Sequence, residues 1–162
     1  MNPIKAIPTN YNGIIFRSRL EAKWAFFMDK LGIKYQYELE GYRFNNKNYL
    51  PDFYLPDWEM FVEVKPSLDF LKSTEGEKVL EFANLQKNGM LLFVDVPNKK
   101  QIYCRLWTTA FIKIVFNLDS NLITLKKTNK MLGKIAFYPA DTEYFDLIAD
   151  EASNKKFTNS IT

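Results

Sequence analysis

Near the start of the chain, apolar residues recur at helical spacing. Their intervals of four, four, three and four residues place them on one face of an α-helix. Before them, residues 1–13 are rich in Asn and Pro and predict an irregular lead-in. A serine near the start and a glycine after the last apolar position are typical of helix ends. The residues that define this expected helix are Phe16, Leu20, Trp24, Phe27 and Leu31, with Ser18 and Gly32 at its ends.

Alternating and short apolar runs follow, which is typical of β-strands. Residues 33–40 (IKYQYELE) alternate and are rich in Tyr, so they predict a strand that packs through its tyrosines. Residues 45–48 (NNKN) predict a turn. Residues 49–55 (YLPDFYL) and 59–65 (EMFVEVK) then predict two strands of a hairpin.

The rest of the chain continues this mixture of helices and strands. A helical pattern covers residues 74–87 and ends at an Asn-Gly pair, and residues 90–96 (MLLFVDV) are typical of a buried strand. Residues 101–138 predict further strands or a strand–helix mixture, and residues 141–157 predict a short helix with a polar tail. The whole chain is therefore expected to be a single α/β domain.

Composition excludes several kinds of chemistry. The chain has no histidine and neither of the common glycine-rich nucleotide loops, which excludes His-ligated zinc and His-based hydrolysis and leaves nucleotide binding without support. A single cysteine, Cys104, cannot form an internal disulfide and is expected in the core. No apolar run approaches the roughly 20 residues that span a bilayer, and no secretory signal is visible. Any chemistry must therefore use carboxylates, lysines and arginines, with or without a metal.

The hairpin of residues 49–65 carries charges among its apolar residues. A turn at residues 56–58 would place Leu55 opposite Met60, and the same register places Asp52 opposite Glu63. Carboxylates that face each other in this way, with Cβ atoms about 5 Å apart, repel and require a cation. Lys65 lies on the same face as Glu63. This pattern predicts a divalent metal site, and the alternative is a surface hairpin with a weak Glu63–Lys65 ion pair of at most about 1 kcal/mol.

Glu21 lies on the flank of the apolar stripe of the first helix. A carboxylate at this position could approach the charges of the hairpin. The alternative is a solvent-exposed i,i+4 ion pair between Arg17 and Glu21, worth a few tenths of a kcal/mol.

Three motifs together resemble a known superfamily. "FRSRLEAKWAFFMDKLGI", then "YLPDF", then "FVEVK" resemble the PD-(D/E)xK nucleases, and more closely small phage- or transposon-type endonucleases with an R-S-x-x-E-A-x-W helix before the hairpin. The resemblance covers about residues 16–96 and implies a restriction-endonuclease-like αβββαβ core, with a mixed central sheet flanked by helices. Residues 97–162 would form a C-terminal β-rich or mixed extension.

The resemblance also implies roles for individual residues. Asp52 and Glu63 would bind Mg²⁺, with Mn²⁺ as a substitute, and the backbone carbonyl of Val64 would be a further ligand. Lys65 would orient or activate the attacking water, and Glu21 would be the helix acid. The implied function is a metal-dependent endonuclease that hydrolyses phosphodiester bonds of DNA, encoded by a phage or mobile element and acting in the bacterial cytoplasm.

Other hypotheses stay open at this point. RNA is not excluded as a substrate, and cleavage of both strands would require a homodimer, a partner protein or two successive nicks. The chain could instead be a catalytically idle nucleic-acid-binding or protein-interaction module on the same fold, or a structural phage protein. Basic residues expected to contact nucleic acid, unless they are only solvated charges, are Arg17, Arg19, Lys72 and Lys78.

Overall fold

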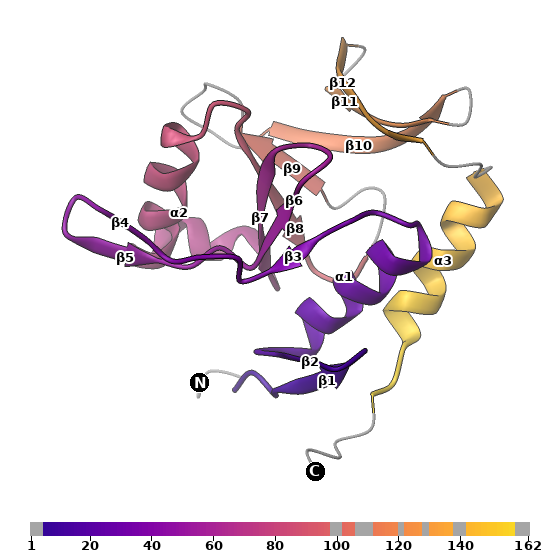
Figure 1. Cartoon of the computed structure of the whole chain (residues 1–162), viewed down its shortest axis with the longest axis horizontal. Coiled ribbons are helices and arrows are strands. Elements are labelled where there is room, and N and C mark those ends of the chain that lie inside the picture. The colour runs from indigo at the N-terminus through magenta and orange to yellow at the C-terminus, as the bar shows by residue number, and fades with distance from the viewer. Residues whose placement is uncertain are drawn as a thin grey trace.

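The chain folds around a mixed β-sheet with helices on both faces (Figure 1). The structure, a computed structural model, describes residues 5–97 and 147–157 with their side chains. It describes the backbone alone for residues 102–105, 112–119, 122–127, 130–137 and 142–146.

One sheet contains most of the strands. Its strands, in spatial order, are β12 (Lys130–Phe137), β11 (Leu122–Lys127), β10 (Ile112–Asp119), β9 (Ile102–Arg105), β8 (Met90–Val94), β7 (Met60–Lys65), β6 (Phe53–Leu55) and β3 (Gln36–Tyr37). Strands β7 and β8 are parallel, and the other neighbours are antiparallel. The 3₁₀-helix η1 (Leu68–Lys72) and helix α2 (Thr74–Leu85) connect the parallel pair. The predicted α/β class is confirmed.

Helix α1 (Arg19–Lys30) begins three residues later than the apolar pattern predicted. The side chain of Ser18 caps it by accepting the N–H of Glu21 at 3.1 Å. At the other end, Gly32 has a φ of +67° and the N–H of Ile33 donates to the Met28 carbonyl at 2.8 Å, as in a Schellman motif. The predicted end at Gly32 is therefore confirmed and Ser18 is the N-cap, whereas Phe16, the first residue of the predicted helix, is the last residue of a strand.

A hairpin occupies the region where an irregular lead-in was predicted. Strands β1 (Thr9–Tyr11) and β2 (Ile14–Phe16) pair through a turn at Asn12 and Gly13, whose φ angles are +50° and +79°. Two-residue hairpin turns favour Asn-Gly because both central residues need positive φ. The sequence thus contained the signal for this hairpin, and the prediction of an irregular segment was wrong.

A second hairpin divides the predicted strands before β6. Strands β4 (Tyr42–Phe44) and β5 (Lys47–Tyr49) pair across Asn45 and Asn46, which both have positive φ. The turn predicted at residues 45–48 is therefore centred on these two residues. The strand predicted at residues 33–40 shortens to β3, and the one predicted at residues 49–55 splits between β5 and β6.

The predicted register of the β6–β7 hairpin is confirmed. Leu55 lies opposite Met60, and Phe53 lies opposite Val62. The β6 ladder ends at Phe53, so Asp52 is one residue beyond the last pair. On the other edge of β7, the backbone continues its pairing with β8 as far as Lys65. Asp52 therefore lies just outside the β6–β7 ladder, beside residues of β7 that still pair with β8.

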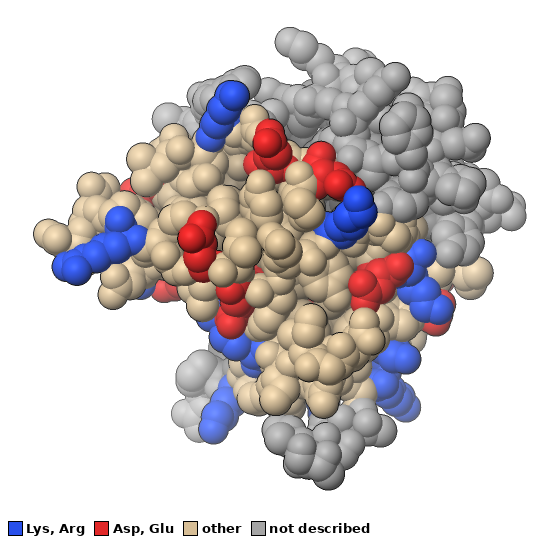
Figure 2. Space-filling view, viewed as in Figure 1, with Lys and Arg blue, Asp and Glu red and all other residues tan. Residues whose placement is uncertain are grey.

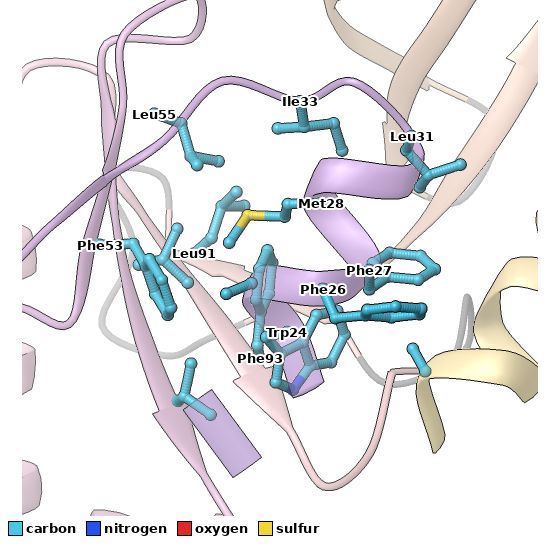
Figure 3. Close-up of a cluster of buried hydrophobic side chains, with 14 of the residues drawn as sticks. Trp24, Phe26, Phe27, Met28, Leu31, Ile33, Phe53, Leu55, Leu91 and Phe93 are labelled. Atoms are coloured by element: carbon cyan, nitrogen blue, oxygen red, sulfur yellow. The ribbon is translucent and has the colours of Figure 1, made fainter. Parts of the chain in front are cut away.

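The sheet separates two clusters of buried side chains. Phe53, Val62 and Val64 belong to the cluster under α1, where the ring of Trp24 stacks on Phe93 with centroids 4.1 Å apart (Figure 3). Phe61 belongs to the second cluster, under α2 and the β4–β5 hairpin. Because side chains alternate along a strand, Glu63 and Lys65 share the face of Phe61.

Helix α3 (Thr142–Asn154) confirms the helix predicted near the end of the chain. Its residues Ile148, Ala149 and Ala152 are buried in the same cluster as α1. Cys104 lies in β9, and its side chain is outside the described residues. Within the part of the chain that the structure describes, no helix has the length and apolar character needed to cross a membrane.

Candidate functional site

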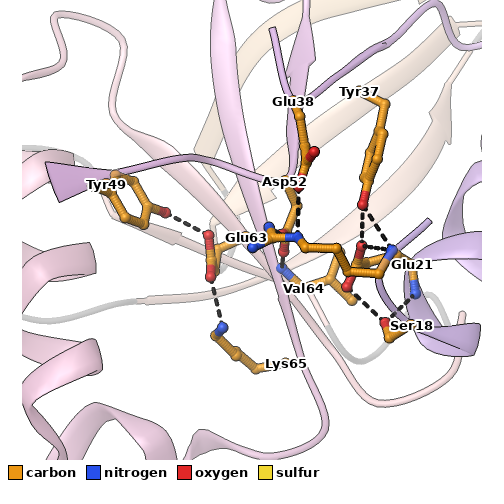
Figure 4. Close-up of polar contacts among 10 residues, drawn as sticks. Ser18, Glu21, Tyr37, Glu38, Tyr49, Asp52, Glu63, Val64 and Lys65 are labelled. Carbon is orange, nitrogen blue, oxygen red and sulfur yellow. Dashed lines mark hydrogen bonds and ion pairs between the residues drawn. The ribbon is translucent and has the colours of Figure 1, made fainter. Parts of the chain in front are cut away.

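Asp52, Glu63 and Lys65 come together where β6 ends beside β7 (Figure 4). Both carboxylates are only 2% exposed. Burying two acids side by side costs free energy unless cations or hydrogen-bond donors compensate them. The partners of their oxygens therefore decide what the site can do.

Each oxygen of the two carboxylates has a donor. Asp52 Oδ2 accepts the N–H of Val64 at 2.7 Å, and Asp52 Oδ1 forms an ion pair with Nη2 of Arg17 at 2.6 Å. Glu63 Oε1 forms an ion pair with Nζ of Lys65 at 2.7 Å. Glu63 Oε2 accepts the hydroxyl of Tyr49 at 2.5 Å. The site is thus a compensated acidic pair, with Arg17 on one acid and Lys65 on the other.

The two acids nevertheless retain strong mutual repulsion. Burial raises the pKa of Asp52 well above its usual value, and the charges of Glu63 and Glu21 raise it further. Burial also raises the pKa of Glu63, although Lys65, Tyr49 and Arg17 oppose that change. A further positive charge between the two carboxylates would therefore be favourable.

Lys65 is held as an ammonium ion. Burial works to lower its pKa, but the adjacent Glu63 and the nearby Asp52 and Glu75 outweigh burial and raise the pKa. Its Nζ also lies 5.6 Å from the ring centroid of Phe70. In this arrangement Lys65 offers positive charge and hydrogen-bond donors, rather than a lone pair that could accept a proton.

Glu21 is buried, with 7% of its surface exposed. Its carboxylate accepts hydrogen bonds from the Ser18 hydroxyl at 2.7 Å, the Tyr37 hydroxyl at 2.7 Å and the backbone N–H of Arg17 at 3.2 Å. The Arg17 side chain instead forms ion pairs with Asp52 and with Glu38. The solvent-exposed pair between the Arg17 and Glu21 side chains is therefore not what the structure shows.

Three residues of the site were not predicted to lie there. Tyr49 donates to Glu63 from the end of β5, Tyr37 donates to Glu21 from β3, and Glu38 pairs with Nε of Arg17 at 2.5 Å. The backbone N–H of Glu38 also donates to the Asp52 carbonyl at 2.9 Å. These contacts join residues far apart in sequence, and no local pattern signals them.

The donor set fits a hard divalent cation. Among residues 5–97 and 147–157, no group of three or more acidic or cysteine side chains is placed to hold a metal ion by itself. Mg²⁺ commonly uses one or two carboxylates and completes its shell with water and phosphate oxygens, so Asp52 and Glu63 can suffice. The carbonyl of Val64 points to the same side of β7 as its N–H, and that N–H donates to Asp52.

The basic residues expected to contact nucleic acid do not form one group. Arg17 belongs to the acidic site, and Arg19 lies on the first turn of α1. Lys72 pairs with Asp69 at 3.6 Å, and Lys78 pairs with Glu75 at 3.4 Å. Figure 2 shows acidic and basic side chains interspersed over one face of the described residues. Contact of these four residues with nucleic acid stays a prediction.

No protein-family model, curated protein or solved structure matches the chain. Its function must therefore be inferred from the residues of the site and their geometry.

Proposed function

We propose that the protein is a divalent-metal-dependent endonuclease that hydrolyses phosphodiester bonds of DNA. The observation that carries the proposal is the adjacent pair Asp52 and Glu63, whose burial, followed by their repulsion, raises the pKa of Asp52, with the Lys65 ammonium 2.7 Å from Glu63. Burying two like charges costs a binding module free energy, whereas a divalent cation uses such carboxylates as ligands.

The order of elements supports the same proposal. Helix α1, strands β3, β6 and β7, helix α2 and strand β8 follow one another as in the αβββαβ core of PD-(D/E)xK nucleases, with the β4–β5 hairpin inserted before β6. The motif residues of that superfamily coincide with Glu21, Asp52, Glu63 and Lys65. We therefore propose a restriction-endonuclease-like core for residues 16–96.

Each residue has a chemical task in this proposal. Asp52, Glu63 and the Val64 carbonyl hold Mg²⁺ or Mn²⁺, which when bound supplies positive charge to the phosphate and lowers the pKa of a water molecule. Lys65 orients the attacking water and donates hydrogen bonds where negative charge develops on the phosphate oxygens. Glu21 positions Arg17 through its backbone N–H.

One observation favours a second candidate, a catalytically idle nucleic-acid-binding or protein-interaction module. Arg17 and Lys65 already compensate both acids without a metal. The Arg17 side chain is 53% exposed, however, so water can solvate its guanidinium when a metal ion replaces it as the cation beside Asp52. Metal dependence separates the two candidates.

The test is nicking of supercoiled plasmid DNA in Mg²⁺, in Mn²⁺ and in EDTA. The wild-type protein should cut only with metal, and Lys65→Ala should lose most of that activity. Lys34→Ala is the matched control, since Lys34 is exposed and pairs with Asp57 at the far end of β6. Absence of nicking by the wild type under all conditions would favour the idle module, and equal activity of all three proteins in EDTA would refute the proposal.

A further inference from the structure

A basic pocket lies between the start of α1 and the end of α3. It encloses about 460 Å³ and is lined by Arg19 and Lys23 of α1 and by Ser153, Asn154, Lys155, Lys156 and Phe157. The residues that line it include four basic ones and no acidic one. This composition suits an anion, and we call this cavity the basic pocket.

Two of its lysines are fixed in place. Lys23 Nζ donates to the carbonyl of Ser153, and Lys155 Nζ lies 4.9 Å from the ring centroid of Phe26. These lysines stabilise the fold even without a ligand, because cations near a helix C-terminus interact favourably with its carbonyls. That benefit does not require Lys156, which is exposed.

The lysines of the basic pocket differ from many others in the chain. Lys30, Lys34, Lys47, Lys65, Lys72 and Lys78 each form an ion pair with a carboxylate. Within the described residues, Lys23, Lys155 and Lys156 have no carboxylate within ion-pair distance. Their positive charge is therefore available to a ligand.

The position of the pocket indicates which anion it binds. Arg19 and Lys23 are one turn apart on α1, and Glu21 lies between them in sequence but on the opposite side of the helix. The pocket thus lies on the side of α1 opposite Glu21, whose carboxylate accepts the backbone N–H of Arg17, and the Arg17 side chain reaches Asp52 of the acidic site. A DNA strand carries a negative charge at every nucleotide, so a strand that presents one phosphate to the acidic site can present another to the pocket.

We propose that the basic pocket binds a backbone phosphate of duplex DNA, separate from the phosphate at the acidic site. The inference rests on the proposed function, which supplies the class of substrate. It assigns a role in substrate binding to α3, and it moves the main phosphate contacts from η1 and α2, where Lys72 and Lys78 lie, to the other face of the sheet.

The test measures affinity for a labelled duplex by fluorescence anisotropy in EDTA, across about 50–200 mM salt. The double variant Lys155→Gln/Lys156→Gln should raise Kd about five- to fifty-fold and reduce the magnitude of the slope of log K against log salt by about 1, as expected for one phosphate that is no longer neutralised. The control Lys34→Gln/Lys87→Gln removes the same charge, from Lys34 beyond the opposite end of α1 and from Lys87 just after the end of α2. It should change Kd less than twofold.

Other outcomes would overturn the proposal. Equal losses in the two double variants would show an effect of net charge alone, and an unchanged Kd in the pocket variant would show that the pocket does not contact DNA. The single variant Lys156→Gln, at an exposed position, should also raise Kd, but without altering the melting temperature, which separates loss of binding from loss of folding. Stabilisation of the protein by inorganic phosphate, with no change in DNA affinity in the pocket variants, would identify a small-anion site instead.

Failure of the nuclease proposal gives a different result. Because the binding assay contains no metal and requires no cleavage, tight and salt-dependent binding through the pocket would persist in a protein that never cuts DNA. Conversely, if the pocket variants bind and cut DNA like the wild type, the nuclease proposal still holds and only the pocket proposal is refuted.

Discussion

Replacing Asp52 by Asn should stabilise the protein in the absence of metal. Asn has the same shape, and its side-chain oxygen can still accept the N–H of Val64. The change removes a negative charge that is buried beside Glu63 and near Glu21. It also removes the ion pair with Arg17, so the net effect depends on which of these contributions is larger.

The structure decides between them. The Arg17 side chain is 53% exposed but that of Asp52 is only 3% exposed, so their ion pair contributes more than a fully exposed pair, about 1–2 kcal/mol. Burial is the largest contribution against the charge of Asp52, and repulsion by Glu63 adds to it, while Lys65 offsets part of that repulsion. For scale, two unit charges at about 4 Å interact by about 4 kcal/mol at an effective dielectric constant of 20. We expect Asp52→Asn to raise the free energy of unfolding by about 1–3 kcal/mol at pH 7.5, or the melting temperature by about 2–12 °C.

The gain should depend on pH. Since folding raises the pKa of Asp52, the folded protein holds its proton more tightly than the unfolded chain. The contribution of the Asp52 carboxyl to the free energy of unfolding is fully present below its pKa in the unfolded chain, and it is lost as the pH rises through its pKa in the folded protein. The difference in melting temperature between Asp52→Asn and the wild type should therefore be largest at alkaline pH and should shrink on acidification.

Melting curves with and without Mn²⁺ complete the test. Metal at 100 times its Kd should stabilise the wild type by about 2.7 kcal/mol, and Asp52→Asn should lose most of that increase. An Asp52→Asn protein that melts below the wild type at every pH, and that Mn²⁺ still stabilises fully, would refute this reasoning.

Three further substitutions test individual contacts. Lys65→Ala should reduce cleavage about 100- to 1,000-fold while Mn²⁺ still raises the melting temperature, because Lys65 supplies charge rather than a metal ligand. Loss of both the cleavage and the Mn²⁺-induced rise in melting temperature would instead place Lys65 in the metal-binding site. Tyr49→Phe removes the hydrogen bond to Glu63 and should lower the free energy of unfolding by about 1.5–3 kcal/mol in urea denaturation; an unchanged midpoint would show that the bond contributes nothing. Glu21→Gln should reduce metal-dependent cleavage much more than stability, as measured by nicking and melting on the same sample, and full activity would leave Glu21 a purely structural role.

Local signals in the sequence account for much of the framework. Ser18 and Gly32 mark the ends of α1 because capping depends on neighbouring residues alone. The register of β6 and β7 follows from a short turn that leaves few pairings open. Because this register was predictable, so was the approach of Asp52 to Glu63.

The compensation of the acidic pair could not be predicted in the same way. Arg17 was expected either to contact phosphate or to pair with Glu21, but its side chain reaches Asp52, 35 residues away in sequence. Tyr49 reaches Glu63 only because the β4–β5 hairpin turns back toward α2. Such contacts depend on tertiary packing, which no local spacing encodes.

The central claim is that Asp52 and Glu63 hold a metal that cleaves DNA. The most direct measurement is nicking of supercoiled plasmid by wild type and Glu63→Gln, in Mg²⁺ and in EDTA, with folding of both proteins checked by circular dichroism. We expect nicking by the wild type in Mg²⁺ alone and none by the folded variant. Equal Mg²⁺-dependent nicking by the folded Glu63→Gln protein would contradict the claim.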